Sequence, residues 1–126
     1  MTANKDYSKI GIVGGAGPYA GLDCAKKILQ ETIAEKDQDY LPTILVSTPE
    51  IIKDRTKFIL GESLENPAYA IFDNILDLYH MGAKLIGIPC NTAHSPAIKN
   101  VFMEKIQQSD INIKVLDMIA ETANFL

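Results

Sequence analysis

Two kinds of apolar pattern alternate along the chain. Short runs rich in β-branched residues, bounded by glycine or proline, are typical of buried strands. Longer stretches with apolar residues three and four positions apart, separated by charges, are typical of amphipathic helices. The runs lie at residues 10–13, 44–48, 84–88 and 113–116, and the helical stretches lie at residues 21–35, 66–82 and 95–108. This alternation predicts an α/β fold.

Local signals set the ends of several elements. Asn66 is a good N-cap, Pro67 suits the first helical position, and Gly82 stops the same helix. Residues 53–63 are ambiguous and have room for a short helical turn, while Asp117 is placed to cap a last helix over residues 118–126. Strands that alternate with helices form parallel sheets with helices on both faces. We expect four strands in the flavodoxin-like order 2-1-3-4.

Composition narrows the classes of protein. A chain of 126 residues with 47% hydrophobic residues is the size of one domain with its own core. The net charge of −4 without a basic cluster, and the absence of Trp, argue against nucleic-acid and anionic-membrane partners. The polar first residues do not resemble a signal peptide, and no apolar run reaches the ~20 residues of a membrane span. We expect a reduced, cytoplasmic protein.

Ligands of open parallel sheets bind beyond the carboxyl ends of the strands. The first such end is the glycine turn at residues 14–17, which three interpretations fit: a tight turn with positive φ, a nucleotide site, or the lining of a small-molecule site. Pro18 and the missing acidic residue after the second strand argue against the dinucleotide fingerprint. No cluster of His, Cys, Asp and Glu has metal-ligand spacing, so we expect no metal site.

Cys90 is the sharpest chemical feature of the sequence. It follows a buried strand and precedes a helix, whose N-terminus favours a thiolate. Asn91 and Thr92 add an amide and a hydroxyl beside it. The alternative is that Cys90 is a small buried hydrophobe. Cys24, within the first helix, is at a position that suits core packing.

Three further polar residues are of a type that can take part in a site. Arg55 follows the second strand and presents a planar fork that matches a carboxylate; the alternative is a solvated loop charge. His94 is better placed to position the turn at Cys90 than to act as an acid or base. His80, near the C-terminal end of a helix, is expected at the surface.

Several of these segments resemble one family. Residues 89–94 (PCNTAH) resemble the first catalytic-cysteine motif of the aspartate racemase branch of the aspartate/glutamate racemase superfamily, and residues 54–56 (DRT) resemble its substrate-binding arginine segment. Residues 10–18 (IGIVGGAGP) are similar to the family's opening strand and turn. Residues 37–39 (DQD) and 118–122 (MIAET) are also similar.

The resemblance implies a PLP-independent mechanism with two thiol bases and no cofactor. Cys90 would be one base. Asn91 and Thr92 would hold the α-carboxylate of the substrate, and Arg55 its side-chain carboxylate. Thr48 is a weaker candidate for lining the pocket. The expected substrate is an acidic amino acid, and aspartate and glutamate are not distinguished.

Family members have two similar domains, and their second cysteine comes from the second domain. Residues 1–126 resemble the N-terminal domain only, so we expect a single α/β domain that lacks the second base. A homo-oligomer or a second domain would cover the exposed cleft. Two alternatives stay open: a non-catalytic module that binds an acidic amino acid or dimerises, and an isomerase or decarboxylase relative acting on another small diacid.

Overall fold

The computed structural model describes residues 9–117, which form a four-stranded parallel sheet with the order β2-β1-β3-β4. The strands are β1 (Lys9–Gly14), β2 (Thr43–Ser47), β3 (Ala83–Gly87) and β4 (Lys114–Val115). The α/β class, the strand order and the parallel direction predicted from the sequence are therefore confirmed. Each strand lies within one or two residues of its predicted run.

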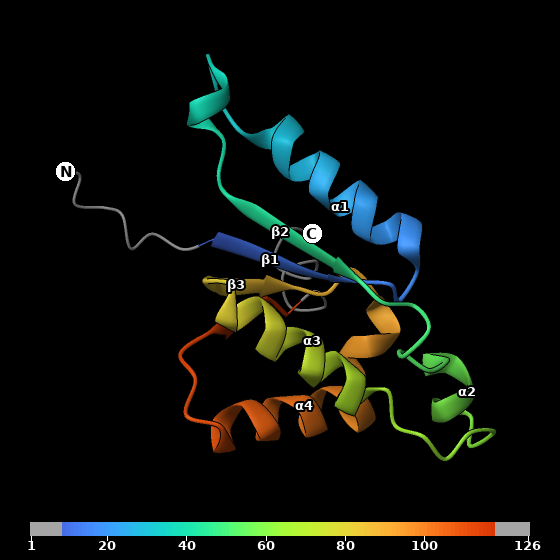
Figure 1. The fold of residues 1–126 in the computed structure, drawn as a ribbon. Coiled ribbons are helices and arrows are strands. Elements are labelled where there is room, and N and C mark those ends of the chain that lie inside the picture. Colours follow the sequence, from blue (N-terminus) through green and yellow to red (C-terminus); the bar gives the residue numbers. More distant parts are fainter. Residues whose placement is uncertain (1–8, 118–126) are drawn as a thin grey trace.

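Helices cover both faces of this sheet. α1 (Pro18–Glu31) lies on one face, and α3 (Ala68–His80) and α4 (Pro96–Gln108) lie on the other (Figure 1). The ambiguous segment contains the short helix α2 (Arg55–Ile59). Two 3-10 helices, η2 (Asp37–Asp39) and η3 (Asn91–His94), complete the described elements. The helix predicted over residues 118–126 lies outside the described residues.

The main core lies between the sheet and the pair α3 and α4. α3 contributes three fully buried aliphatic side chains to it, Ile71, Ile75 and Leu78, and α4 contributes Ile98 and Phe102. Each such side chain supplies about 1.5–3 kcal/mol of transfer free energy. The sheet is thus held chiefly from this side.

α1 packs more thinly than its sequence pattern suggested. It begins at Pro18 and ends at Glu31, and two of its patterned apolar residues are exposed, Leu22 by 58% and Leu29 by 51%. Ile33, which the predicted helix included, lies beyond the end of α1 and is 99% exposed. Gly21 is the buried residue of α1, and a Cβ there would lie 3.0 Å from the Cα of Gly14. α1 therefore approaches β1 through two glycines, which brings the backbones together but buries little side-chain surface.

The glycine turn connects β1 to α1 and packs against the backbone that follows β2. Gly15 and Gly17 both have positive φ, as the tight-turn interpretation predicts. A Cβ on Gly15 would lie 2.8 Å from the backbone nitrogen of Thr48, so only glycine permits this approach. Gly17 is the N-cap of α1, with Pro18 at the first helical position.

α3 has the ends that its sequence predicted, shifted by one residue at the start. Pro67 is the N-cap, and the side-chain oxygen of Asn66 accepts a hydrogen bond of 2.9 Å from the backbone nitrogen of Ala68. Gly82 follows the last turn with φ of 101°. His80 is exposed at this end, as expected.

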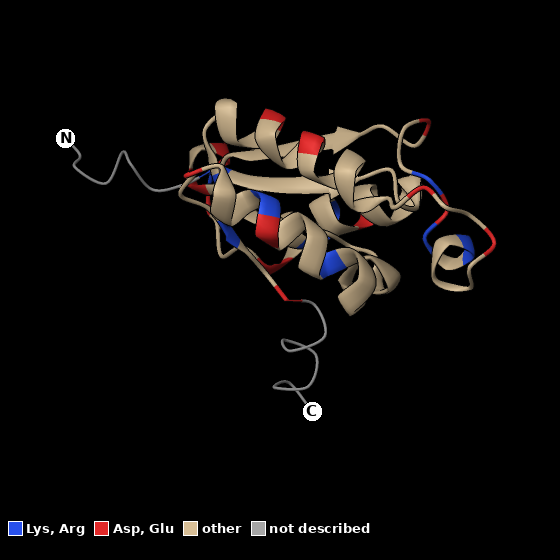
Figure 2. Ribbon diagram, turned by 90° about the horizontal axis from the view of Figure 1, so that it is seen from below, with Lys and Arg blue, Asp and Glu red and all other residues tan. Residues whose placement is uncertain are grey.

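The surface carries both signs of charge. Figure 2 shows Lys and Arg interspersed with Asp and Glu on the face seen there. Among residues 9–117, no helix has the length and apolar character needed to cross a membrane.

Candidate functional site

The carboxyl ends of β1, β2 and β3 lie at one edge of the sheet, where α2 and η3 also lie (Figure 1). β2 and β3 flank β1, and neighbouring strands are about 4.8 Å apart, so the ends of β2 and β3 are roughly 10 Å apart. The glycine turn lies between them. This edge can therefore present groups from three strand ends to one small ligand.

The Cys90 turn, defined here as residues 88–94, carries the candidate thiol. The Cys90 backbone is extended, and its N–H donates to the carbonyl of Ile88 at 2.8 Å. The side chain of Cys90 is half-buried and packs against the main core. Asn91, exposed, and Thr92, half-buried, are the first two residues of η3.

The helix predicted over residues 95–108 is confirmed as α4, but the expectation that its N-terminus faces Cys90 was wrong. The helix after Cys90 is the single 3-10 turn η3, and the long helix α4 begins only at Pro96. The residue before a proline avoids the α region, so Ser95 cannot join the two segments into one helix. The dipole of a long helix therefore does not begin at Cys90. The helical backbone N–H groups that follow Cys90 are those of η3.

His94 fastens this turn. It is only 3% exposed, and its Nε2 lies 2.9 Å from the carbonyl oxygen of Ile88. A carbonyl can only accept, so Nε2 donates, and the same oxygen receives the N–H of Cys90. His94 thus ties the end of the Cys90 turn to its beginning. Its Nδ1 is buried and has no hydrogen-bond partner among the described residues.

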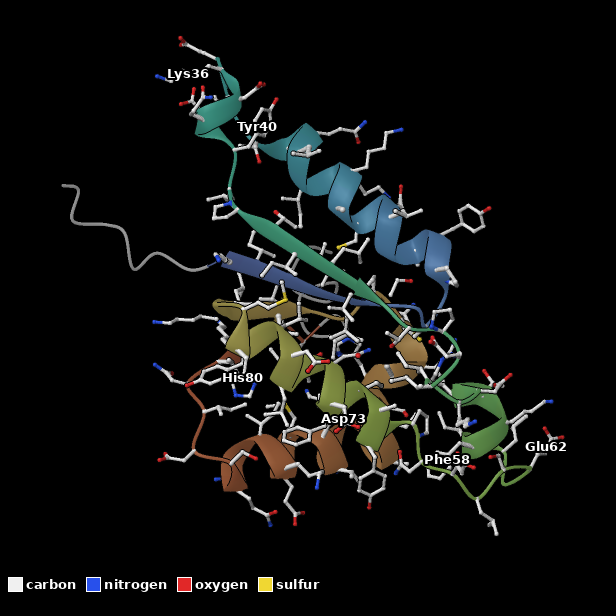
Figure 3. The ribbon with its side chains drawn as sticks, viewed as in Figure 1. Lys36, Tyr40, Phe58, Glu62, Asp73 and His80 are labelled. Atoms are coloured by element: carbon white, nitrogen blue, oxygen red, sulfur yellow. The ribbon has the colours of Figure 1, made fainter. Side chains whose placement is uncertain are left out.

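Arg55 lies on the helix that contacts this turn. It is the first residue of α2, and α2 contacts η3. Asp54 caps α2 by accepting the backbone N–H of Lys57 at 2.9 Å, and this hydrogen bond lowers the pKa of Asp54. Phe58 packs against the main core (Figure 3) and so anchors α2. Local capping and one aromatic contact therefore set the position of Arg55.

The Arg55 side chain is half-buried, and its hydrogen bonding is incomplete. Nη1 donates to the carbonyl of Lys53 at 3.4 Å. Nε is buried and has no hydrogen-bond partner within residues 9–117. A guanidinium with incomplete hydrogen bonding is chemically suited to an anionic ligand.

Thr48 has a partner that the sequence did not reveal. It follows β2 directly, and its hydroxyl oxygen accepts a hydrogen bond of 2.9 Å from Nδ2 of Asn74 on α3. Asn74 is 1% exposed. It lies on the buried face of α3. The available signal was that Asn74 is the one amide in an otherwise apolar stripe.

Cys24 occupies a different place. It is half-buried and lines a groove of about 480 Å³ between α1 and Pro89, called here the α1 groove. Burial and, to a smaller extent, the charge of Asp23 raise the pKa of the Cys24 thiol. It is thus only partly the core residue that was expected. Among the described residues no group of three or more His, Cys, Asp or Glu could hold a metal ion.

Known proteins give this arrangement its context. The aspartate racemase of Picrophilus torridus superposes with a TM-score of 0.70 and 32% sequence identity, over 93% of this chain and 71% of that one. The chain belongs to the aspartate/glutamate racemase superfamily. No family model matches the sequence.

Two further members of this superfamily are similar over one domain. The broad specificity amino-acid racemase RacX of Bacillus subtilis (strain 168) is 29% identical over 119 residues, which are 90% of this chain and 47% of RacX. PH1733, an aspartate racemase homologue from Pyrococcus horikoshii OT3, shares the fold with a TM-score of 0.65 and 24% identity, over 93% of this chain and 47% of its own. The chain spans about half the length of these two relatives.

Proposed function

We propose that this chain is one domain of a PLP-independent racemase of aspartate or glutamate, in which the Cys90 thiolate removes and returns the α-proton. The observation that carries the proposal is the contact of α2 with η3. This contact supports a site shared by α2, which carries the incompletely bonded Arg55, and by the turn that carries Cys90. A site with a cation and a thiol at one edge suits an acidic amino acid.

The proposed chemistry begins with a bound amino acid whose α-C–H bond faces Cys90. The thiolate takes the proton, and the electron pair of the C–H bond passes into the α-carboxylate system. Because that proton is very weakly acidic, the site must stabilise the negative charge that develops there. Asn91 and Thr92, with the backbone N–H groups of η3, are the proposed donors to the α-carboxylate.

Arg55 takes the side-chain carboxylate in this proposal, and Thr48 lines the pocket from the β2 end. Two hydrogen bonds from one guanidinium fix both the charge and the orientation of a carboxylate. A dicarboxylic amino acid would then span from Arg55 to η3. No cofactor takes part in any step.

Racemisation needs a second base on the opposite face of the α-carbon. Cys24 is unsuited to this role, because it lies on a helix, matches no catalytic motif and has a thiol pKa that burial raises. We propose that the second thiol belongs to a second domain or a partner chain. The 126-residue chain by itself should exchange an α-proton slowly without inverting the centre.

The test is α-proton exchange of L-aspartate in deuterated water, followed by ¹H NMR, together with chiral chromatography for D-aspartate. We expect slow exchange with retention and no measurable racemisation. Cys90→Ser should abolish exchange, whereas Cys24→Ser should not change it. Exchange that survives in Cys90→Ser removes the thiol from its role, and rapid racemisation by this chain contradicts the single-base proposal. Binding without any exchange would favour the non-catalytic binding module instead.

A further inference from the structure

Asn74 is out of place as a packing residue. It lies on the apolar face of α3 beside fully buried aliphatic neighbours such as Ile71 and Ile75, yet it carries an amide. A buried amide is costly unless its hydrogen bonds are made, and a leucine of similar volume would fill the same space without that cost. The amide therefore needs an explanation beyond packing.

Its partner is the Thr48 hydroxyl, 26 residues earlier in the chain. We propose that Asn74 is a positioning residue of the acidic amino-acid site: it holds the Thr48 oxygen so that the hydroxyl proton is delivered to a carboxylate oxygen of the ligand. The inference rests on the proposed function and adds a residue to it. Asn74 itself touches no ligand.

The backbone of Thr48 is fixed from the other side. The turn at Gly15 lies against it so closely that a Cβ would be 2.8 Å from the Thr48 nitrogen. The glycine turn thus sets the Thr48 backbone, and Asn74 sets its side-chain oxygen. Only the hydroxyl proton of Thr48 can then change its direction when a ligand binds.

The two hydrogen-bond distances indicate where that proton goes. Nδ2 of Asn74 donates to the Thr48 oxygen at 2.9 Å, while the return bond from the hydroxyl to Oδ1 of Asn74 is longer, at 3.3 Å. A carboxylate is a stronger acceptor than a neutral amide oxygen. A hydroxyl whose oxygen already accepts a hydrogen bond is also a stronger donor through its own proton. An incoming carboxylate should therefore take the proton from the long bond.

The test is the affinity for L-aspartate, measured by titration, of Asn74→Leu, Thr48→Val and the double variant. Each single variant should bind about tenfold more weakly, because Thr48→Val removes the hydroxyl that donates to the ligand carboxylate and Asn74→Leu leaves that hydroxyl unpositioned. The double variant should bind no more weakly than either single one, since both act through the same proton. Asn100→Leu, an exposed asparagine on α4, is the matched control and should bind normally.

The difference between the loss of affinity and the change in exchange rate distinguishes positioning from a merely structural role. In Asn74→Leu, α-proton exchange at saturating L-aspartate should stay within about twofold of the wild-type rate, so that the loss falls on affinity. Unchanged affinity in a folded Asn74→Leu variant, or losses that multiply in the double variant, would overturn the inference. Thermal melts establish which variants are folded.

A second measurement needs neither a ligand nor the Asn74 variant. In Thr48→Val, the Nδ2 proton resonance of Asn74 should move upfield and exchange faster with water, because its acceptor is gone. An unchanged resonance contradicts the pairing. The proposed function fails in another way, when the wild-type chain shows no Cys90-dependent exchange, so the two failures are distinguishable.

Discussion

The two cysteines occupy regions that are built differently. The Cys90 turn follows a strand, and two hydrogen bonds converge on the Ile88 carbonyl to hold its shape. The α1 groove, which Cys24 lines, lies between Pro89 and a helix on which the apolar residues Leu22 and Leu29 are exposed. A thiol acts on a substrate only when surrounding groups orient both. The comparison teaches that position at a strand end, rather than the presence of a thiol, marks the candidate site.

The largest expected effect compares one cation from each region, Arg55 on α2 and Lys27 in the α1 groove. Arg55→Gln should weaken L-aspartate binding by roughly 10–100-fold, because hydrogen bonds to charged groups contribute about 1.5–3 kcal/mol. Lys27→Gln, which removes a cation that lines the α1 groove, should leave the affinity unchanged. Titration of both variants decides between the regions. Equal losses would show that only general electrostatic attraction is involved.

His94 gives the next largest effect. His94→Leu leaves the Ile88 carbonyl with one donor fewer and should destabilise the protein by about 1–3 kcal/mol. Because the Cys90 turn is then less firmly held, α-proton exchange should slow about 5–10-fold. His80→Leu, at the opposite end of α3 from α2 (Figure 3), is the control for both readouts. A stability loss with full exchange activity would mean that the turn keeps its shape without His94.

A smaller effect is expected on the reactivity of the second thiol. Burial and then the charge of Asp23 raise the pKa of Cys24, with a partial opposing effect of Lys27. The thiol thus stays protonated at neutral pH, and in Cys90→Ser its alkylation by iodoacetamide should be a few-fold slower than that of an unfolded peptide thiol. The rate should rise with pH above the ordinary range of thiols, and Asp23→Asn should speed it. If Cys24 were alkylated faster than the peptide thiol at pH 7, its pKa would not be raised and the contrast between the two cysteines would fail.

The smallest effect belongs to Cys24→Ala. Its side chain is only half-buried, so we expect a change in unfolding free energy below about 1 kcal/mol. L-aspartate affinity and α-proton exchange should both be unchanged. Urea denaturation together with the exchange assay checks this. A loss of exchange would place the α1 groove in the mechanism.

The elements that the sequence predicted best are those with more than one agreeing signal. α4 begins where Ser95 and Pro96 indicate, and α3 ends at His80, two residues before the predicted stop at Gly82. α1 was less well predicted, because apolar spacing identifies a helix but not which apolar residues a neighbour covers. Leu29 is exposed since α1 meets the sheet through Gly21 rather than through its larger side chains.

The candidate site was predictable only in part, for a similar reason. Motifs place Cys90 and Arg55 at strand ends, and the topology brings those ends together. The pairing of Thr48 with Asn74 joins residues from β2 and α3, so it exists only once the sheet and helix have packed. The split of residues 91–108 into η3 and α4 was readable from Pro96, because the residue before a proline avoids the helical region.

The central position of β1 has a consequence for biosynthesis. β1 is the first described strand to leave the ribosome, yet its ladder is complete only after both β2 and β3 have been made. The edge of β1 that pairs with β3 must therefore stay unpaired while more than seventy further residues are translated. Such non-local pairing is slow and exposes a nascent chain to aggregation. A translational pause before β3 should thus lower the soluble yield more than the same pause after it.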